Sequence, residues 1–214
     1  MAQPRKRTIM MRKDTPKGSK PTVKRWNIKT LLIGDGGVGK TSLVEQFVSS
    51  NFDVDYKITI GVNVMNKIVV LSETENVNLV INDVAGQPRF EVMRQTFYLG
   101  AQVVLAVYDL TRKQSLDNLL DVWLPELMTS NPPKESLPPM QVLLIGNKSD
   151  LEDLRSISDE EINSTLDSMK QNFPKTKFIG SLETSAKDNV AVDDAFIKIA
   201  NEYVSKLKEM YPSK

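Results

Sequence analysis

The sequence predicts an α/β protein built on a six-stranded, mostly parallel sheet, with one antiparallel strand and helices on both faces. From residue 26 onwards, apolar runs of strand length alternate with segments of helix length. The run at residues 103–108 is apolar throughout, which is typical of a parallel strand covered on both faces. A short polar link at residues 72–76 joins two strand-like runs and predicts the antiparallel pair.

Each strand is predicted from a run of aliphatic residues bounded by polar residues, glycine or proline. Strands are predicted at residues 26–33, 61–71, 77–82, 103–108, 140–145 and 176–182. The segments at 50–60 and 84–90 are predicted to be loops, the second of them containing Pro88.

The helices are predicted from apolar residues recurring at three- and four-residue spacing between the strands. They are predicted at residues 40–49, 91–99, 112–129, 158–171 and 190–208. Ser158 followed by Glu161 is a capping box and fixes the start of the fourth helix. Residues 130–139 carry four prolines and predict a stiff, non-helical surface loop, which is either a plain connector or a ligand for a proline-recognition domain.

A glycine-rich loop follows the first strand and precedes the first helix, at residues 34–41. Two glycines five residues apart, then Lys40 and Thr41, fit the phosphate-binding P-loop, although such a string also arises by chance in glycine-rich turns. Glycines let backbone N–H groups face a phosphate, and the following helix adds its positive N-terminal end. Lys40 would reach the outer phosphates, and the Thr41 hydroxyl suits Mg²⁺. The residues predicted to hold phosphate are Gly36, Gly37, Val38, Gly39, Lys40, Thr41 and Ser42, which makes the fold that of a P-loop NTPase.

Composition excludes several other kinds of site. The chain of 214 residues has no Cys and no His, so thiolate and imidazole metal sites, Cys nucleophiles and disulfides are absent. No apolar run approaches the 18 residues of a membrane span, and no signal-peptide core follows the basic start. We therefore expect a cytoplasmic protein that is at most peripheral to a membrane.

The formal net charge of +1 hides a strongly basic first segment. Residues 1–25 hold nine basic residues against Asp14 alone, a charge of +8, so the remainder carries −7. Few apolar residues and three prolines predict that this extension is disordered. It is either a solvated tail or a weak electrostatic contact with anionic lipid, and nucleic acid or an acidic partner protein is less favoured. The expected domains are this extension, a nucleotide-binding domain at residues 26–210, and a tail at 211–214.

Four further motifs resemble those of the small GTPases of the Ras superfamily, and most closely the Rab branch. They are Tyr-Lys-Ile-Thr-Ile-Gly-Val at residues 56–62, Asp-Val-Ala-Gly-Gln at 83–87, Asn-Lys-Ser-Asp at 147–150 and Thr-Ser-Ala-Lys at 184–187. Each string alone is weak, but with the P-loop all five occur in the family's order over residues 26–208.

The resemblance implies that the base is guanine. A carboxylate such as Asp150 accepts hydrogen bonds from both N–H groups on one edge of guanine, whereas adenine presents a bare acceptor there. Lys148 has an aliphatic stem that can lie along the base plane, and Asn147 would tie this loop to its neighbours. By resemblance the Ala186 N–H donates to guanine O6. The resemblance also places Phe52 (alternatively a core aromatic), Tyr56, Ser185 and Lys187 at the nucleotide.

The resemblance further implies a switch driven by the terminal phosphate. Thr59 and, through water, Asp83 would bind Mg²⁺ together with Thr41, while Gly86 N–H would sense the γ-phosphate. Gln87 is the candidate catalytic residue that orients the attacking water. Loss of the γ-phosphate would release both loops, giving a different surface for each nucleotide.

Hydrolysis also needs positive charge near the terminal phosphate. No Arg lies between residues 52 and 59, and Arg89 and Arg94 are expected to be mainly exposed helix charges. Gly36 and Gly37 bring no side chain over the phosphates. We therefore expect slow intrinsic turnover that depends on an arginine, or another group, from an activating partner.

Three features depart from the Rab pattern. Asn63, Val64 and Asn82 stand where Rab proteins have Asp, Phe and Trp, so specific Rab effectors do not carry over. Pro88 follows Gln87 and biases it toward extended conformations, which puts its catalytic geometry in doubt. Without Cys the chain has no prenylation site, and Ala2 excludes N-myristoylation.

The sequence thus predicts a small GTPase acting as a GTP/GDP switch, with Mg²⁺ as cofactor and with an exchange factor, an activating protein and effectors as partners. Two alternatives remain open. Pro88 favours an interaction module that binds nucleotide without appreciable hydrolysis. An ATP-using P-loop enzyme is the other, and Asp150 disfavours it.

Overall fold

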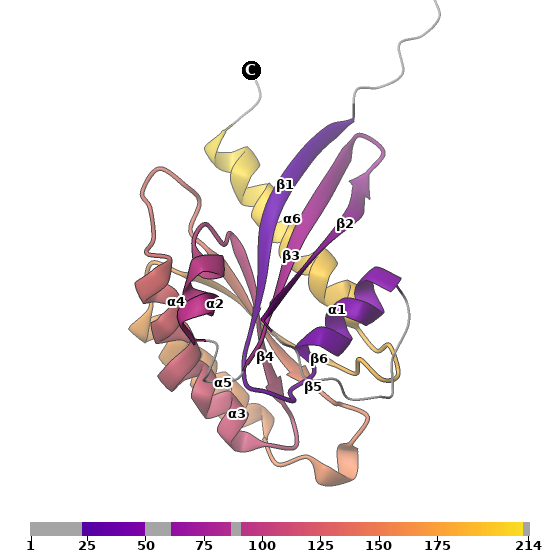
Figure 1. Cartoon of the computed structure of the whole chain (residues 1–214), viewed down its shortest axis with the longest axis vertical. Helices are drawn as coiled ribbons and strands as arrows, with labels where there is room; N and C mark the ends of the chain where they lie inside the picture. Colours follow the sequence, from indigo (N-terminus) through magenta and orange to yellow (C-terminus); the bar gives the residue numbers. More distant parts are fainter. Residues whose placement is uncertain (1–22, 50–60, 87–90, 212–214) are drawn as a thin grey trace, which may run out of the picture.

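One six-stranded sheet organises the part of the chain that the structure describes, and it confirms the predicted fold class (Figure 1). The computed structural model describes residues 23–49, 61–86 and 91–211. The strand order is β2-β3-β1-β4-β5-β6, with β2 antiparallel to β3 and every other pair parallel. The strands are β1 (Lys24–Ile33), β2 (Val62–Ser72), β3 (Glu75–Val84), β4 (Val103–Asp109), β5 (Gln141–Asn147) and β6 (Lys177–Thr184).

Helices cover the two faces of this sheet, as the alternation of elements predicted. They are α1 (Lys40–Ser49), α2 (Glu91–Tyr98), α3 (Lys113–Asn118), α4 (Leu124–Ser130), α5 (Asp159–Asn172) and α6 (Val192–Met210), with short turns η2 (Leu119–Trp123) and η3 (Glu152–Leu154). The Ser158 capping box is formed as predicted. Within the described ranges, no helix combines the length and apolar character needed to cross a membrane.

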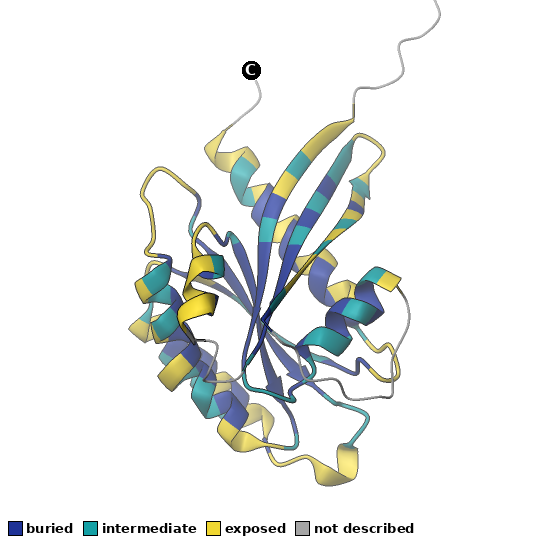
Figure 2. Cartoon of the chain, in the orientation of Figure 1, coloured by how far each residue is buried: buried dark blue, intermediate teal, exposed yellow. Residues whose placement is uncertain are grey.

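The core consists of two apolar layers, one on each side of the sheet. The first packs α1 and α6 on the strands, and there Phe47 stacks on Phe196 with ring centroids 4.0 Å apart. The second packs the helical segment from α3 to α4, together with α5, on the opposite face. Every residue of β4 and β5 is buried, as expected for central parallel strands (Figure 2).

The predicted helix at residues 112–129 is not one continuous α-helix. It consists of α3, a π-helical turn at η2, and α4. Pro125 explains part of this break, because proline has no N–H for the helical ladder and is tolerated only in a first turn, where α4 holds it. The wider π turn leaves Trp123 5% exposed, facing the glycine loop and α2.

The proline-rich connector at residues 131–140 is non-helical, as predicted. Its first residue, Asn131, is buried and holds the segment before β4, because its amide donates to Ala101 O at 3.0 Å and accepts from Gly100 N at 2.9 Å. The connector is therefore anchored at its start, and whether it is read by a proline-recognition domain stays an open alternative.

The topology brings the motifs to one end of the sheet. Parallel strands β1, β3, β4, β5 and β6 end there, and the loops after β1, β3, β5 and β6 carry the motifs of the phosphate, switch and base sites. This end lies opposite the start of β1 and the end of α6 (Figure 1). Ligands of open α/β sheets bind at this edge.

Candidate functional site

The glycine loop between β1 and α1 adopts a conformation that only glycine allows at several points. Gly34, Gly37 and Gly39 have φ of 136°, 78° and 97°. A Cβ on Gly34 would lie 2.0 Å from Val107 O, and one on Gly39 would lie 2.2 Å from the amide nitrogen of Asn147. The loop is therefore held close to β4 and β5, and its glycines are required by packing as well as by backbone geometry.

Lys40 is the first residue of α1, and its ammonium group is folded back onto the loop. It donates to Gly34 O at 2.6 Å and to Asp35 O at 2.8 Å, and the residue is only 6% exposed. Burial lowers the pKa of Lys40 to about 8, although the Asp83 and Asp35 carboxylates favour its charged form. A buried ammonium with carbonyl partners alone would gain from an anion in the loop.

Thr41 and Asp83 bring two hard oxygen ligands together below the loop. The Thr41 hydroxyl donates to Asp83 Oδ2 at 2.6 Å, and Asp83 is fully buried at the end of β3. Burial raises the pKa of Asp83, while the Thr41 hydrogen bond and Lys40 oppose that rise. Among the described residues, Asp83 Oδ1 has no hydrogen-bond partner. An unpartnered carboxylate oxygen beside a hydroxyl fits a Mg²⁺ site, directly or through water.

Asn147, at the end of β5, joins three segments. Its buried amide donates to Val38 O in the glycine loop at 2.9 Å. Its oxygen accepts from the Thr184 hydroxyl and from the Ala186 N–H, both at 3.2 Å. The sequence predicted that Asn147 would tie this loop to its neighbours, and the hydrogen bonds confirm it.

Asp150 is held by the loop after β6, and Lys148 is held by the end of β4. Ser185, fully buried, donates to Asp150 Oδ1 at 2.7 Å, and Lys187 approaches Asp150 Oδ2 at 3.6 Å. Lys148 has φ of 70° and pairs with Asp109 at 2.7 Å. Burial alone would raise the pKa of Asp109, but hydrogen bonds from Lys148 and Thr111 hold it below its usual value. The two side chains that were predicted to read the base therefore have fixed positions.

A cavity of about 530 Å³ lies beside these base-reading residues. Lys148, Asp150 and Ser185 contribute to its wall, together with Leu110 and Val190. Apart from Glu183 of β6, its polar groups belong to the loops after β5 and β6, which meet through Asn147. A planar group bound here could contact the Asp150 carboxylate, the aliphatic stem of Lys148 and the apolar side chains of Leu110 and Val190.

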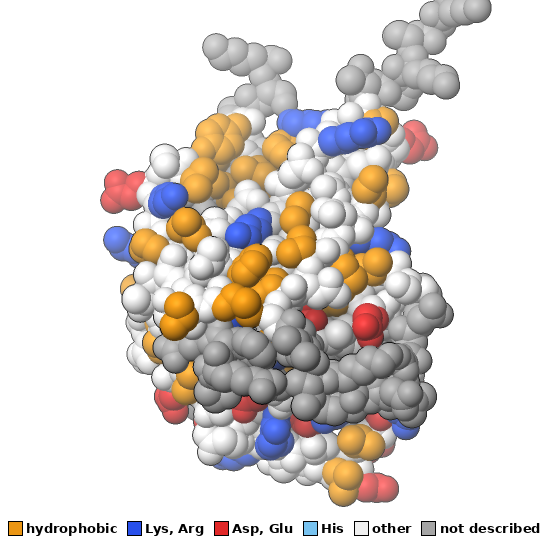
Figure 3. All heavy atoms as spheres, in the orientation of Figure 1, with side chains coloured by type: hydrophobic (Ala, Val, Ile, Leu, Met, Phe, Trp, Pro, Cys, Tyr) orange, Lys and Arg blue, Asp and Glu red, His pale blue; other side chains and the backbone are white. Residues whose placement is uncertain are grey.

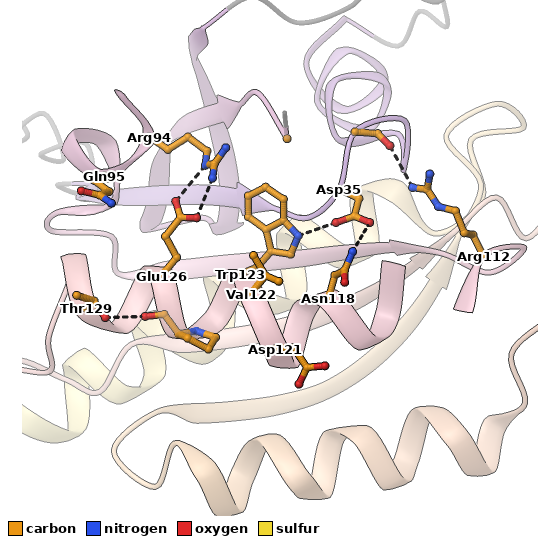
Figure 4. A pocket seen from close by; sticks show the side chains of 13 residues that line it. Asp35, Arg94, Gln95, Arg112, Asn118, Asp121, Val122, Trp123, Glu126 and Thr129 are labelled. Carbon is orange, nitrogen blue, oxygen red and sulfur yellow. Dashed lines mark hydrogen bonds and ion pairs between the residues drawn. The ribbon is translucent and has the colours of Figure 1, made fainter. Parts of the chain in front are cut away.

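Asp35 anchors the glycine loop to the helical segment on the other side, a role that the sequence did not reveal. Its two carboxylate oxygens accept from Trp123 Nε1 and from the Asn118 amide, each at 2.8 Å (Figure 4). Asp35 is one of the variable positions of the P-loop pattern, so the motif carried no signal for this contact. The π turn at η2 supplies the second anchor point, Trp123.

Arg94, in α2, corrects an expectation. It was expected to be mainly an exposed helix charge, but it is 3% exposed and forms a two-pronged ion pair with Glu126 of α4 at 3.0 and 2.7 Å (Figure 4). Its guanidinium also lies over the Trp123 ring, 4.7 Å from the centroid. Burial alone would lower the pKa of Arg94, but Glu126 and Tyr98 together raise it above its usual value. The amphipathic pattern of α2 could not reveal a partner that lies 32 residues away.

A second cavity, of about 780 Å³, lies between α2, the α3-to-α4 segment and the glycine loop (Figure 4). Its lining includes the loop residues Gly36 and Gly86, the two arginines Arg94 and Arg112, and also Gln95, Asp121, Val122, Pro125 and Thr129. Both guanidinium groups are close enough to Lys40 to favour loss of its proton. Arg94 and Arg112 thus bring positive charge to this corner of the site, where Asp35, Asp121 and Glu126 supply negative charge.

Several predicted site residues lie outside the described part of the chain. They are Phe52, Tyr56, Thr59 and Gln87, and Pro88 and Arg89 lie there too. Gly86 is described, and a Cβ on it would lie 2.6 Å from Lys40 Nζ and 2.5 Å from Gly34 O. The backbone after β3 therefore passes directly against the phosphate loop.

The positions that depart from the Rab pattern lie on neighbouring strands. Val64 pairs with Asn82 across β2 and β3, and its side chain is 49% exposed. The Asn82 side chain is buried and donates to Thr30 O and Val80 O. The Asn82 side chain therefore forms hydrogen bonds within the fold, and only Val64 of this pair faces solvent.

The fold and the site define a P-loop nucleotide-binding protein of the GTPase type. Comparison with known proteins identifies the family: the model of the Ras family matches residues 29–205. The chain is 36% identical over 188 residues to the Ras-related protein Rab-1 of Theileria parva, covering 86% of this chain and 77% of the relative. It is 35% identical to Ras-related protein Rab-7b of Bos taurus, over 89% of this chain and 88% of the relative. It is 38% identical to the GTP-binding protein ypt2 of Schizosaccharomyces pombe, over 82% and 80%.

The chain therefore belongs to the Ras family, and it is Rab-like. It is a small GTPase, a protein that binds guanine nucleotide and hydrolyses GTP to GDP and phosphate. The family relationship confirms the class of protein that the five motifs predicted.

The buried Arg94–Glu126 pair yields a stability prediction. We expect Glu126→Gln to lower the free energy of unfolding by about 3 kcal/mol, because it leaves a buried guanidinium without its carboxylate. The double variant Arg94→Met/Glu126→Leu should lose less than the sum of the single variants, because no unpaired charge is buried. Urea unfolding of all forms with GDP in fixed excess measures this, and additive losses would contradict it.

Proposed function

We propose that the described loops form one guanine-nucleotide site and that this small GTPase is a GTP/GDP switch acting in membrane trafficking. The observation that carries the proposal is the Asn147 side chain, which joins the phosphate loop to both base-reading loops. A site in which phosphate and base contacts share one buried junction suits a nucleotide held along its whole length. The Rab and Ypt relatives support the assignment to trafficking.

The phosphates and Mg²⁺ are assigned to the glycine loop and the residues around it. Backbone N–H groups of residues 36–42, with Lys40, hold the phosphates. Thr41, Thr59 and, through water, Asp83 hold Mg²⁺, and the oxygen pair at Thr41 and Asp83 supports this. The ion neutralises phosphate charge when it is bound, and the chain's own residues orient the nucleotide around it.

The base is assigned to the loops after β5 and β6. Asp150 accepts the two guanine donors, Lys148 lies along the base plane, and Ala186 N–H is available to O6. Ser185 holds the Asp150 carboxylate, and Asp109 holds Lys148. Lys187, Phe52 and Tyr56 complete the set by family resemblance.

Hydrolysis and switching are assigned to Gln87, Thr59 and Gly86. Gln87 orients the attacking water, while Thr59 and the Gly86 N–H contact the γ-phosphate only in the GTP state. The contact geometry of Gly86 with Lys40 supports a sensor at that point. Pro88 favours the second candidate function, a nucleotide-bound interaction module with little hydrolysis.

Effectors, an exchange factor and an activating protein are the partners of such a switch. The face that carries β2 and α2 has exposed aliphatic residues, and hydrophobic side chains gather over β2, β3 and α2 in Figure 3. The exposed large hydrophobic residues of β2 and α2 are Val64, Ile68, Val70, Val92 and Met93. Rab proteins have aromatic residues at the positions of Val64 and Asn82. Because Val64 is aliphatic and Asn82 is buried, we expect a partner different from those that bind these aromatic residues of Rab proteins.

The basic extension is assigned a weak contact with anionic membrane. It precedes β1, whose first residues Lys24 and Arg25 continue its positive charge. Clustered Lys and Arg gain roughly 1 kcal/mol each near an anionic surface. Deleting residues 1–22, which leaves β1 intact, should abolish binding to vesicles containing phosphatidylserine. Flotation should show no binding to neutral vesicles and weaker binding at higher salt, whereas salt-independent binding would contradict the assignment.

Asp150→Ala should reduce the preference for GTP over ATP. Two charge-assisted hydrogen bonds at about 1.5–3 kcal/mol each imply a loss of discrimination of roughly 10²–10⁴-fold. Competition of GTP and ATP against a fluorescent GDP analogue measures the ratio. Asp153→Ala, an exposed carboxylate in the same loop, is the matched control and should leave the ratio unchanged. An ATP preference in the parent protein would favour the ATP-using alternative.

Gln87→Leu tests the switch against the interaction module. We expect single-turnover hydrolysis of Mg²⁺·GTP to slow roughly tenfold or more, with GDP affinity unchanged, because the attacking water loses its orienting group. Gln171→Leu, which replaces an exposed glutamine on α5, is the control. Equal rates for Gln87→Leu and the parent would remove Gln87 from catalysis, and no measurable turnover in the parent would favour the module.

A further inference from the structure

Arg112 reaches from the start of α3 to the phosphate loop. Its Nη2 donates to Gly36 O at 3.0 Å (Figure 4). Its own backbone is firmly held, because its N–H donates to Asp109 O at 2.9 Å and its carbonyl accepts from the Ser115 hydroxyl at 2.6 Å. The side chain therefore projects from a fixed base toward the loop.

The contact lies at the terminal-phosphate end of the loop. The other end, Val38 and Gly39, touches Asn147 and so lies toward the base-reading loops. Gly34 and Asp35, just before Gly36, instead contact Gly86 and Lys40, the groups assigned to the outer phosphates. Arg112 also lines the same cavity as Gly36 and Gly86. A guanidinium at Gly36 O is thus on the γ-phosphate side of the site.

Arg112 has donors to spare, whereas Arg94 does not. Arg94 is buried, with its fork occupied by Glu126. Arg112 is exposed, and the one hydrogen bond that its side chain makes to the described residues goes to a neutral carbonyl. A guanidinium has five N–H donors, and a charge-assisted bond to phosphate is roughly twice as strong as one to a neutral acceptor. A terminal phosphate would therefore compete well for this side chain.

We propose that Arg112 is a catalytic arginine supplied by the chain itself, whose guanidinium donates to the terminal phosphate of bound GTP. Water attacks the γ-phosphorus, the bond to the β,γ-bridging oxygen breaks, and GDP leaves with the bonding electron pair, while the proton lost by the water passes to an oxygen of the released phosphate. Arg112 neither gives nor takes a proton; it stabilises negative charge on the phosphate oxygens in the transition state. The inference rests on the proposed function of the same site.

This assignment changes the chemistry expected of the activating partner. Arg112 already brings a guanidinium to Gly36 O, so a second arginine from outside would meet like charge at that point. A partner that presents a neutral hydrogen-bonding side chain fits the site better. The sequence led us to expect that an activating partner supplies the arginine, or another group, for hydrolysis. Under this proposal the chain supplies the arginine itself.

Single-turnover hydrolysis by the full chain, preloaded with Mg²⁺·GTP, tests the proposal. Arg112→Ala should slow hydrolysis about tenfold or more while GDP affinity stays within about twofold. Arg112→Lys should recover part of the rate, and millimolar guanidinium ion should partly restore Arg112→Ala but not the parent. Lys113→Ala removes the adjacent positive charge, whose partner is Glu161 on α5, and should behave as the parent.

Hydrolysis by Arg112→Ala within about twofold of the parent would overturn the proposal, as would a loss that tracks reduced GDP affinity and resists guanidinium rescue. If the parent itself does not hydrolyse GTP, the proposed function fails separately. A non-hydrolysable GTP analogue then decides the role of Arg112. Arg112→Ala should lower its affinity relative to GDP about tenfold, the size of one charge-assisted hydrogen bond, and an unchanged ratio would refute the contact.

Discussion

The buried amide of Asn147 ties the phosphate loop to the base-reading loops, and the nucleotide site depends on that junction. The amide nitrogen of Asn147 donates to Val38 O, and its oxygen accepts from the Thr184 hydroxyl and the Ala186 N–H. The close approach also requires Gly39, since a Cβ there would lie 2.2 Å from the Asn147 amide nitrogen. A buried polar side chain with both groups satisfied specifies one arrangement of its neighbours, because any other leaves an unpaired group in the interior.

The sheet makes this junction possible. Strands β1 and β5 both lie beside β4, so the loops that follow them are brought to one edge although they are more than a hundred residues apart. β4 is buried throughout and also supplies Val107 O against Gly34 and Asp109 against Lys148. The central strand thus positions both ends of the site without contributing a motif of its own.

The fold and the motif residues could be predicted because both have local signals. A few consecutive residues are enough to recognise a strand run, the Ser158 capping box or the P-loop glycines. Asp35, Arg94 and Arg112 could not be placed in the same way, because each acts through a partner that is 32 to 88 residues away. The π turn was missed for a related reason: Pro125 signals a break, but the repacking that turns Trp123 inward is a tertiary effect.

Trp123 joins the two parts of the structure that a terminal phosphate would affect. Its indole N–H holds Asp35 of the phosphate loop, and its ring faces Arg94 of α2 at 4.7 Å and Lys40 at 5.9 Å. Because Arg94 is also fixed to Glu126, α2 is anchored to the same rigid helical segment as the loop. A partner that contacts the exposed residues of α2 would therefore bind a helix whose position is linked to the phosphate loop through Trp123.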